Sequence, residues 1–186
     1  MNEDKLDEFS LKELIGYSIE AEKSAQKFYE DFSKAAIGVL VKERFRGLVR
    51  DEKVHKDRLL DLHEELFGDK DYVVPDSDDL PPHETSYDFT GARNVLDSLE
   101  KAMENESNAK TLYEYMGERF EEYSSFFKYL ALMEKGHYES LVEEKKLMEG
   151  EYEEGKKGDQ EGSQDFWERM FDFSTQTDGF ELDKGR

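Results

Sequence analysis

Apolar residues recur at helical spacing in four long stretches of this chain. The first stretch begins after Ser10, which is a predicted N-cap because Glu13 stands at the capping-box position three residues later. Gly38 and Gly68 follow the first and second stretches, and glycine is the residue that most often ends a helix. The pattern therefore predicts an all-α fold, with residues 1–9 as a polar lead-in. The predicted helices span about 10–36, 39–67, 91–120 and 123–148.

The segments between and after these helices suggest how they are connected. Residues 69–90 hold all three prolines and many acids, so we expect a long crossover from one end of a bundle to the other, between two helix hairpins. Residues 149–164 lose the apolar spacing and contain four glycines, which predicts a flexible linker. Residues 165–173 (DFWERMFDF) are strongly aromatic and are expected to pack on a bundle, their own or a neighbour's. The predicted domains are thus a four-helix bundle at 1–148 and a linker with a short aromatic segment at 149–186.

A short unit of polar residues occurs twice, once in each predicted hairpin. Its order is Glu, then Tyr seven residues later, then Glu-x-x-His on the following helix. The two copies are offset by 84 residues in their first half and by 82 in their second half. The matched pairs are Glu22 with Glu106, Ala25 with Ala109, Tyr29 with Tyr113, Glu52 with Glu134, and His55 with His137.

Helical geometry gives this unit a chemical meaning. A Glu and a His three residues apart lie on one face of a helix, so they can bind one ion together. Seven residues are almost two turns, so Tyr29 and Tyr113 lie on the same stripes as Glu22 and Glu106 and their hydroxyls can reach the site. Both of these glutamates fall inside apolar stripes, where unpaired carboxylates are costly. Two divalent cations would balance four such carboxylates, so the pattern predicts a metal site.

The other two histidines, His63 and His83, have leucine at the position three residues earlier. They do not complete a Glu-x-x-His motif. We therefore expect ordinary surface or loop histidines at both positions.

Composition limits the classes of protein and ligand. The net charge of −21 disfavours binding to nucleic acid or to a membrane of anionic lipids, because both depend on clustered Lys and Arg. No apolar run approaches a membrane span, and the N-terminus resembles no signal peptide, so a cytoplasmic protein is expected. The chain has no cysteine, which leaves oxygen and imidazole ligands for a metal. Such ligands accept iron, manganese or a mixed pair of the two metals.

Over about residues 10–148 the chain resembles the ferritin-like superfamily, and its IEAEKSAQKFYE segment is most similar to the rubrerythrin family. The resemblance implies a ferritin-like four-helix bundle with two iron ions per chain. Residue by residue, it implies one iron on Glu22 and His55 and the other on Glu106 and His137. It also implies that Glu52 and Glu134 bridge both irons, and that two chains form a homodimer.

The chain departs from the family pattern at three places. Rubrerythrins carry a further Glu where this chain has Ala109, so a redox-dependent exchange of ligands is not implied. The rubredoxin-like domain is missing, since its iron is held by cysteines, so electrons must come from an external donor such as a rubredoxin-like protein. Lys53 stands where the related bacterioferritins have a haem-binding Met, so no haem is expected.

Three functions are consistent with these residues. The first is a rubrerythrin-like di-iron oxidoreductase that reduces hydrogen peroxide to water, in which Tyr29 and Tyr113 orient the carboxylates by hydrogen bonds. The second is a ferroxidase that oxidises Fe(II) with dioxygen for iron storage or detoxification. The third is a non-catalytic helical interaction protein whose aromatic C-terminal segment binds a partner.

Overall fold

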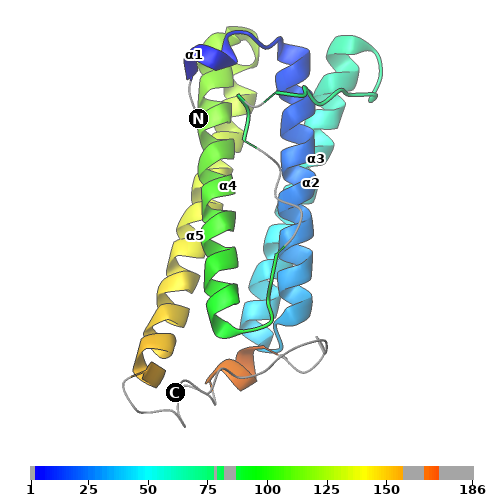
Figure 1. The fold of residues 1–186 in the computed structure, drawn as a ribbon. Coiled ribbons are helices and arrows are strands. Elements are labelled where there is room, and N and C mark those ends of the chain that lie inside the picture. Colours follow the sequence, from blue (N-terminus) through cyan, green and yellow to red (C-terminus); the bar gives the residue numbers. More distant parts are fainter. Residues whose placement is uncertain (1–2, 78, 82–86, 157–165, 172–186) are drawn as a thin grey trace.

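Four long helices run along a common axis in the computed structural model of the chain (Figure 1). The structure describes residues 3–77, 79–81, 87–156 and 166–171. Helices α2 (Leu11–Ala35) and α3 (Val39–Phe67) pack together as one hairpin, and α4 (Ala92–Arg119) and α5 (Ser124–Lys156) form the other, with the short helix η1 (Glu121–Tyr123) between them. The described residues contain no strand, which confirms the predicted all-α fold.

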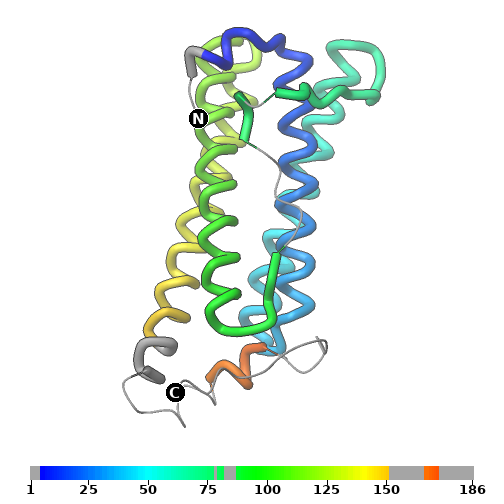
Figure 2. The backbone as a smooth tube through the Cα atoms, in the orientation of Figure 1, coloured from blue at the N-terminus to red at the C-terminus, as the bar shows by residue number. Residues whose placement is uncertain are grey.

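A long crossover joins the two hairpins. It leaves α3 at one end of the bundle and enters α4 at the opposite end (Figure 2). Several hydrogen bonds attach its described parts to the bundle, including one to α2 and one to α4. The hydroxyl of Tyr17 on α2 donates to the carbonyl oxygen of Pro81 at 2.9 Å, and the amide of Asn105 on α4 donates to the hydroxyl of Tyr87 at 3.0 Å. The predicted crossover is therefore present.

The helix ends follow the local sequence signals. The Ser10 hydroxyl accepts a hydrogen bond from the backbone N–H of Glu13, whose carboxylate accepts one from the N–H of Ser10, so the capping box is confirmed. Gly68 ends α3 with φ of 87°, a left-handed conformation that glycine adopts without steric cost.

Two apolar clusters fill the two ends of the bundle. On α2 one cluster takes residues 14–19 and the other residues 28–36, and on α3 the order is reversed, with 41–48 in the second cluster and 59–62 in the first. The glutamates and histidines of the repeated unit lie between the two clusters on each helix, and its two tyrosines belong to the clusters themselves. The fold thus places them near the middle of the bundle, away from both ends.

Two predicted boundaries were wrong. The lead-in at residues 1–9 contains a short helix, α1 (Glu3–Leu6), and the Leu6 side chain is fully buried in one of the apolar clusters. Helix α5 continues past Met148 to Lys156, through part of the predicted linker. Glu and Lys have high helix propensity and the helix was already nucleated, so it outlasts the loss of apolar spacing. The rest of that linker lies outside the described residues.

The aromatic segment after the linker packs on its own bundle. Residues 166–170 are helical and lie below the turn between α2 and α3 (Figure 1). The N–H groups of Ile37 and Gly38 both donate to the carbonyl oxygen of Met170, at 2.6 and 3.2 Å. Phe171 is 1% exposed and meets the ring of Phe32 edge-on at 5.4 Å. Of the two docking sites expected, the chain's own bundle is the one observed.

Within the described part of the chain, no helix combines the length and the apolar character needed to span a bilayer.

Candidate metal centre

Six side chains of the repeated unit meet in the middle of the bundle, and the four long helices all contribute. α2 and α4 each supply one glutamate, and α3 and α5 each supply a Glu-x-x-His pair, as the helical spacing predicts. None is more than 5% exposed: Glu22 2%, Glu52 0%, His55 1%, Glu106 2%, Glu134 1% and His137 5%.

Glu52 and Glu134 each divide their two oxygens between the two histidines. Glu52 places Oε2 3.2 Å from Nδ1 of His55 and Oε1 2.8 Å from Nδ1 of His137. Glu134 places Oε1 2.9 Å from Nδ1 of His55 and Oε2 3.2 Å from Nδ1 of His137. Both carboxylates therefore span the gap between the two imidazoles, which is the geometry that a bridging ligand requires.

Glu22 and Glu106 each face a single histidine. Oε2 of Glu22 lies 3.6 Å from Nδ1 of His55, and Oε2 of Glu106 lies 3.6 Å from Nδ1 of His137. The cluster thus has two matching halves, each with one histidine and one glutamate of its own, and the halves share the two spanning carboxylates.

The two tyrosines bind the remaining glutamate oxygens, and they do so across the repeat. Tyr29 on α2 donates a hydrogen bond to Oε1 of Glu106 on α4, and Tyr113 on α4 donates one to Oε1 of Glu22 on α2. Each of these glutamates therefore offers one oxygen to a tyrosine and turns the other toward a histidine. The sequence predicts that the tyrosines reach the carboxylates, but the exchange between helices depends on how α2 and α4 face each other.

Burial and mutual repulsion control protonation in the metal-free cluster. Burial, together with the charges of Glu52 and Glu134, raises the pKa of both Glu22 and Glu106 well above the usual range. Burial by itself lowers the pKa of His55, but the contacts with carboxylates outweigh it and raise this pKa to about 12. The pKa of His137 rises for the same reason. Without a metal, the cluster thus holds protons that offset its negative charges.

The pKa values of the two tyrosines are also raised, mainly by burial and then by the carboxylates that they contact. Tyr29 and Tyr113 therefore remain neutral at ordinary pH. A neutral phenol donates a hydrogen bond, so each tyrosine holds its glutamate in place without adding charge.

The donor atoms fit a pair of metal ions. Oε1 of Glu52 and Oε1 of Glu134 are buried and have no hydrogen-bond partner, although each lies within 3 Å of an imidazole nitrogen. Glu52, His55, Glu134 and His137 all offer a ligand atom within 4.8 Å of one another. Buried oxygens without partners that converge on one point are the arrangement expected of metal ligands.

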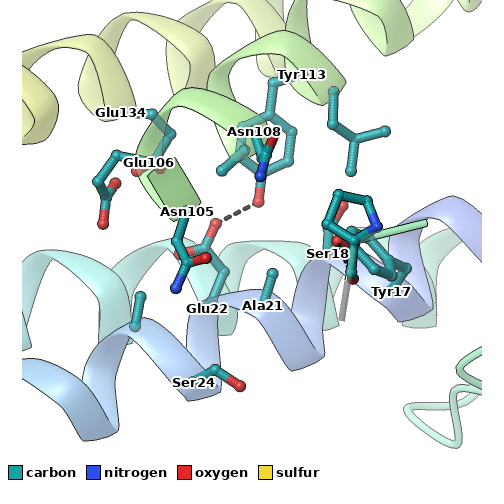
Figure 3. Close-up of a pocket in the computed structure, with 14 residues that line it drawn as sticks. Tyr17, Ser18, Ala21, Glu22, Ser24, Asn105, Glu106, Asn108, Tyr113 and Glu134 are labelled. Atoms are coloured by element: carbon teal, nitrogen blue, oxygen red, sulfur yellow. Dashed lines mark hydrogen bonds between the residues drawn. The ribbon is translucent and has the colours of Figure 1, made fainter. Parts of the chain in front are cut away.

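A small cavity lies beside the cluster, between α2 and α4 (Figure 3). Its volume is about 40 Å³, and Glu22, Glu106 and Glu134 reach its inner wall. Pro81 of the crossover lies on the same cavity. The rest of the lining comes from α2 and α4 and is mostly small or polar: Tyr17, Ser18, Ala21, Ser24, Ala25, Asn105, Asn108, Ala109, Leu112 and Tyr113.

The predictions for the other histidines had different outcomes. His63 was predicted to lie on the surface or in a loop, and this was wrong, because its side chain is fully buried on α3. Its Nδ1 lies 2.7 Å from the carbonyl oxygen of Asp69, in the turn that Gly68 makes possible, and its ring lies 4.9 Å from that of Phe67. The Leu at its −3 position excludes the metal motif but carries no information about this turn. His83 lies outside the described residues.

An ion pair between α3 and α5, with a buried glutamate and a half-exposed arginine, was not predicted. Glu144 is 2% exposed and accepts a hydrogen bond from Arg44. A signal was present in the sequence, because Glu144 follows His137 by seven residues and so lies on the same inward stripe of α5.

Comparisons with known proteins agree with this architecture. The family model described as Rubrerythrin matches residues 13–158. A solved structure titled as a hypothetical protein from Pyrococcus furiosus is 30% identical in sequence, with a TM-score of 0.73, and the match covers 81% of this chain and 97% of that one. No curated protein matches. Because the family model covers most of the chain, and the ferritin-like bundle and its carboxylate cluster have the family's form, this chain belongs to the rubrerythrin family.

Proposed function

We propose that this protein is a di-iron oxidoreductase that reduces hydrogen peroxide to water with electrons from an external donor. The observation that carries the proposal is the division of carboxylate oxygens, in which Glu52 and Glu134 each face both histidines while Glu22 and Glu106 each face one. One iron would be held by Glu22 and His55 and the other by Glu106 and His137, with Glu52 and Glu134 shared. Membership of the rubrerythrin family supports iron as the metal.

When bound, a pair of iron ions would supply two electrons, because each iron would change its oxidation state by one. Two electrons are what one peroxide needs: hydrogen peroxide, two electrons and two protons give two molecules of water, with cleavage of the O–O bond. An external donor, such as a rubredoxin-like protein, would then return the electrons, since the chain has no cysteine to hold an iron–sulfur group of its own.

The side chains around the metals keep the ligands in place. Tyr29 and Tyr113 keep their protons and fix one oxygen of Glu106 and of Glu22, so the other oxygen stays turned toward its histidine. Carboxylates that are held in this way do not have to reorganise when the charge of the centre changes. The apolar clusters on either side limit the access of water from the two ends of the bundle.

The test begins with anaerobic loading of the protein with Fe(II), followed by metal analysis. The reduced protein is then mixed in a stopped-flow instrument with hydrogen peroxide and, in parallel, with dioxygen. We expect two irons per chain and oxidation by peroxide at least tenfold faster than by dioxygen at equal concentration. Fast consumption of dioxygen with continued turnover of added Fe(II) would instead identify a ferroxidase. If no iron is retained, the repeat has an architectural role alone.

A homodimer is also proposed for this protein, on the family's precedent. Sedimentation of the iron-loaded chain measures its mass directly. A species with the mass of one chain over the micromolar range would contradict this part of the proposal.

A further inference from the structure

We infer that the cavity between α2 and α4 is the binding site through which hydrogen peroxide reaches the metal centre, and that Ala25 and Ala109 keep it open. This inference rests on the proposed function. It assigns an entry path and two residues that control access to a cluster that is otherwise enclosed by its own helices.

The position of the cavity is the first argument. It is the space beside the cluster where three of the four site carboxylates, Glu22, Glu106 and Glu134, form part of the wall. The lining residues Asn105, Asn108 and Ala109 are partly exposed, so the lining extends from the surface of α4 to the buried site carboxylates. A molecule inside it is already in contact with the ligands.

The size of the cavity selects small molecules. One water molecule requires roughly 10–15 Å³ of cavity volume. A cavity of about 40 Å³ therefore has room for a molecule with two or three heavy atoms. Hydrogen peroxide fits, whereas a hydroperoxide with an aromatic or branched alkyl group does not.

The lining suits a molecule that both donates and accepts hydrogen bonds. The side-chain amide nitrogen of Asn105 donates a hydrogen bond to the Tyr87 hydroxyl. This contact fixes the orientation of the amide and leaves its carbonyl oxygen as an acceptor. Asn108, one turn further along α4, adds a second amide to the wall. Hydrogen peroxide has two O–H donors and two acceptor oxygens, whereas dioxygen has no donor, so polar walls favour the peroxide.

Ala25 and Ala109, which occupy matching positions in the repeat, both line the cavity. Each follows its glutamate by three residues, one turn further along the same face of the helix. A longer side chain at either position would project into the cavity from α2 or from α4. Alanine therefore leaves open the volume that the oxidant needs.

The described part of the crossover reaches this cavity at one residue. Pro81 lines the cavity, and the hydroxyl of Tyr17 donates to its carbonyl oxygen. This contact holds Pro81 against α2. The size of molecule that the cavity admits is therefore limited by Pro81 as well as by the two helices.

The experiment compares Ala109→Leu and Ala25→Leu with Ser107→Leu. Ser107 lies on α4, is exposed and does not line this cavity, so the third variant controls for the added side chain. All three are loaded with iron, and metal content and thermal unfolding are measured first. With two irons retained, we expect the rate constant for peroxide to fall at least tenfold in the first two variants and to stay within twofold of the wild type in the control. Cumene hydroperoxide should react at least a hundredfold more slowly than hydrogen peroxide with the wild type.

A binding measurement separates this inference from the proposed function. Azide is a small anion that binds open positions on ferric ions and changes their visible absorption. We expect the dissociation constant for azide to rise at least tenfold in Ala109→Leu and Ala25→Leu, even if the wild type proves to reduce no peroxide. Wild-type rates and wild-type azide affinity in both alanine variants would overturn the inference while leaving the peroxide reductase intact.

Discussion

The two helix hairpins, α2–α3 and α4–α5, match at the middle of the bundle and differ at its ends. In the middle, each hairpin contributes a glutamate, a tyrosine, an alanine and a Glu-x-x-His pair, and the contacts of one half mirror those of the other. At one end, Arg44 and Glu144 form a polar contact. At the other end, the residues that match them in the repeat are Phe126 and Leu62, which belong to an apolar cluster.

This difference shows which positions the chemistry fixes. Two ions with the same ligands need the same donors at the same depth, so the two copies of the unit stay alike where they touch the site. The ends of the bundle have only to exclude water and fill space, and several combinations of residues do this equally well. The repeat is therefore strict in its polar residues and loose in its apolar ones.

The largest effect is expected from removing the carboxylates in the middle of the bundle that face both histidines. Glu52→Ala and Glu134→Ala each remove a carboxylate that faces both histidines, so each should lower iron content from two per chain to one or fewer. Metal analysis after anaerobic loading and dialysis measures this directly. Because the two hairpins match here, the two losses should be equal, and Glu139→Ala, an exposed position on α5, should retain both irons. Full metal content in either site variant would refute the assignment of a shared ligand.

A moderate effect is expected at the end where the hairpins differ. Arg44→Ala leaves Glu144 buried without its cation, and we expect a loss of about 1–3 kcal/mol in the free energy of unfolding, lower than for a fully buried pair because the Arg44 side chain is 46% exposed. Glu144→Leu introduces the residue type found at the matching position of the other hairpin, Leu62. This variant should unfold at or above the unfolding temperature of the wild type. Iron content should stay at two in both variants. Chemical denaturation measures the free energy of unfolding of both variants. A strong loss of stability in Glu144→Leu would contradict this prediction.

The same end predicts a pH dependence. Burial raises the pKa of Glu144 above its ordinary value of 4.5, although Arg44 opposes the shift. The folded state then binds a proton more tightly than the unfolded state, so the contribution of this group to stability falls as pH rises from 4.5 through the folded pKa. Arg44→Ala should increase the part of this decline that is due to Glu144, because the opposing charge is gone. Glu144→Leu should remove that part. Unfolding curves of the metal-free proteins between pH 4 and pH 8 test the sign.

The smallest effect is expected from the tyrosines. Tyr29→Phe and Tyr113→Phe each remove one buried hydrogen bond to a carboxylate oxygen, which should lower the free energy of unfolding by about 0.5–1.5 kcal/mol. Both variants should keep two irons and react with peroxide several-fold more slowly, because Glu106 or Glu22 is no longer held. Equal changes in the two variants would extend the match between the hairpins to their reactivity. A rate equal to that of the wild type in both would show that the hydroxyls have no part in orienting the ligands.

Most of the site could be predicted from the sequence because it follows from local periodicity. The spacing of Glu52 and His55 fixes a shared helix face, and the position of Glu22 within an apolar stripe predicts its burial, which the structure confirms. The exchange of tyrosines between α2 and α4 could not be predicted in this way, since it depends on how two distant helices face each other. The burial of His63 depends likewise on the turn at Gly68. Tertiary contacts, and not helix propensity, decide such features.

The contact of Met170 and Phe171 with the turn between α2 and α3 also affects the order in which the protein is made. Ile37 and Gly38 are synthesised before the second hairpin, and the carbonyl oxygen of Met170 that accepts their hydrogen bonds is synthesised only after all four long helices. Until then, Phe32 lacks one of the aromatic rings that pack against it, the ring of Phe171. While the second hairpin is being synthesised, the first hairpin therefore lacks part of the cover over its apolar end, and such surfaces make nascent chains prone to association. Residues 166–171 complete this end of the bundle only after the four long helices have been synthesised.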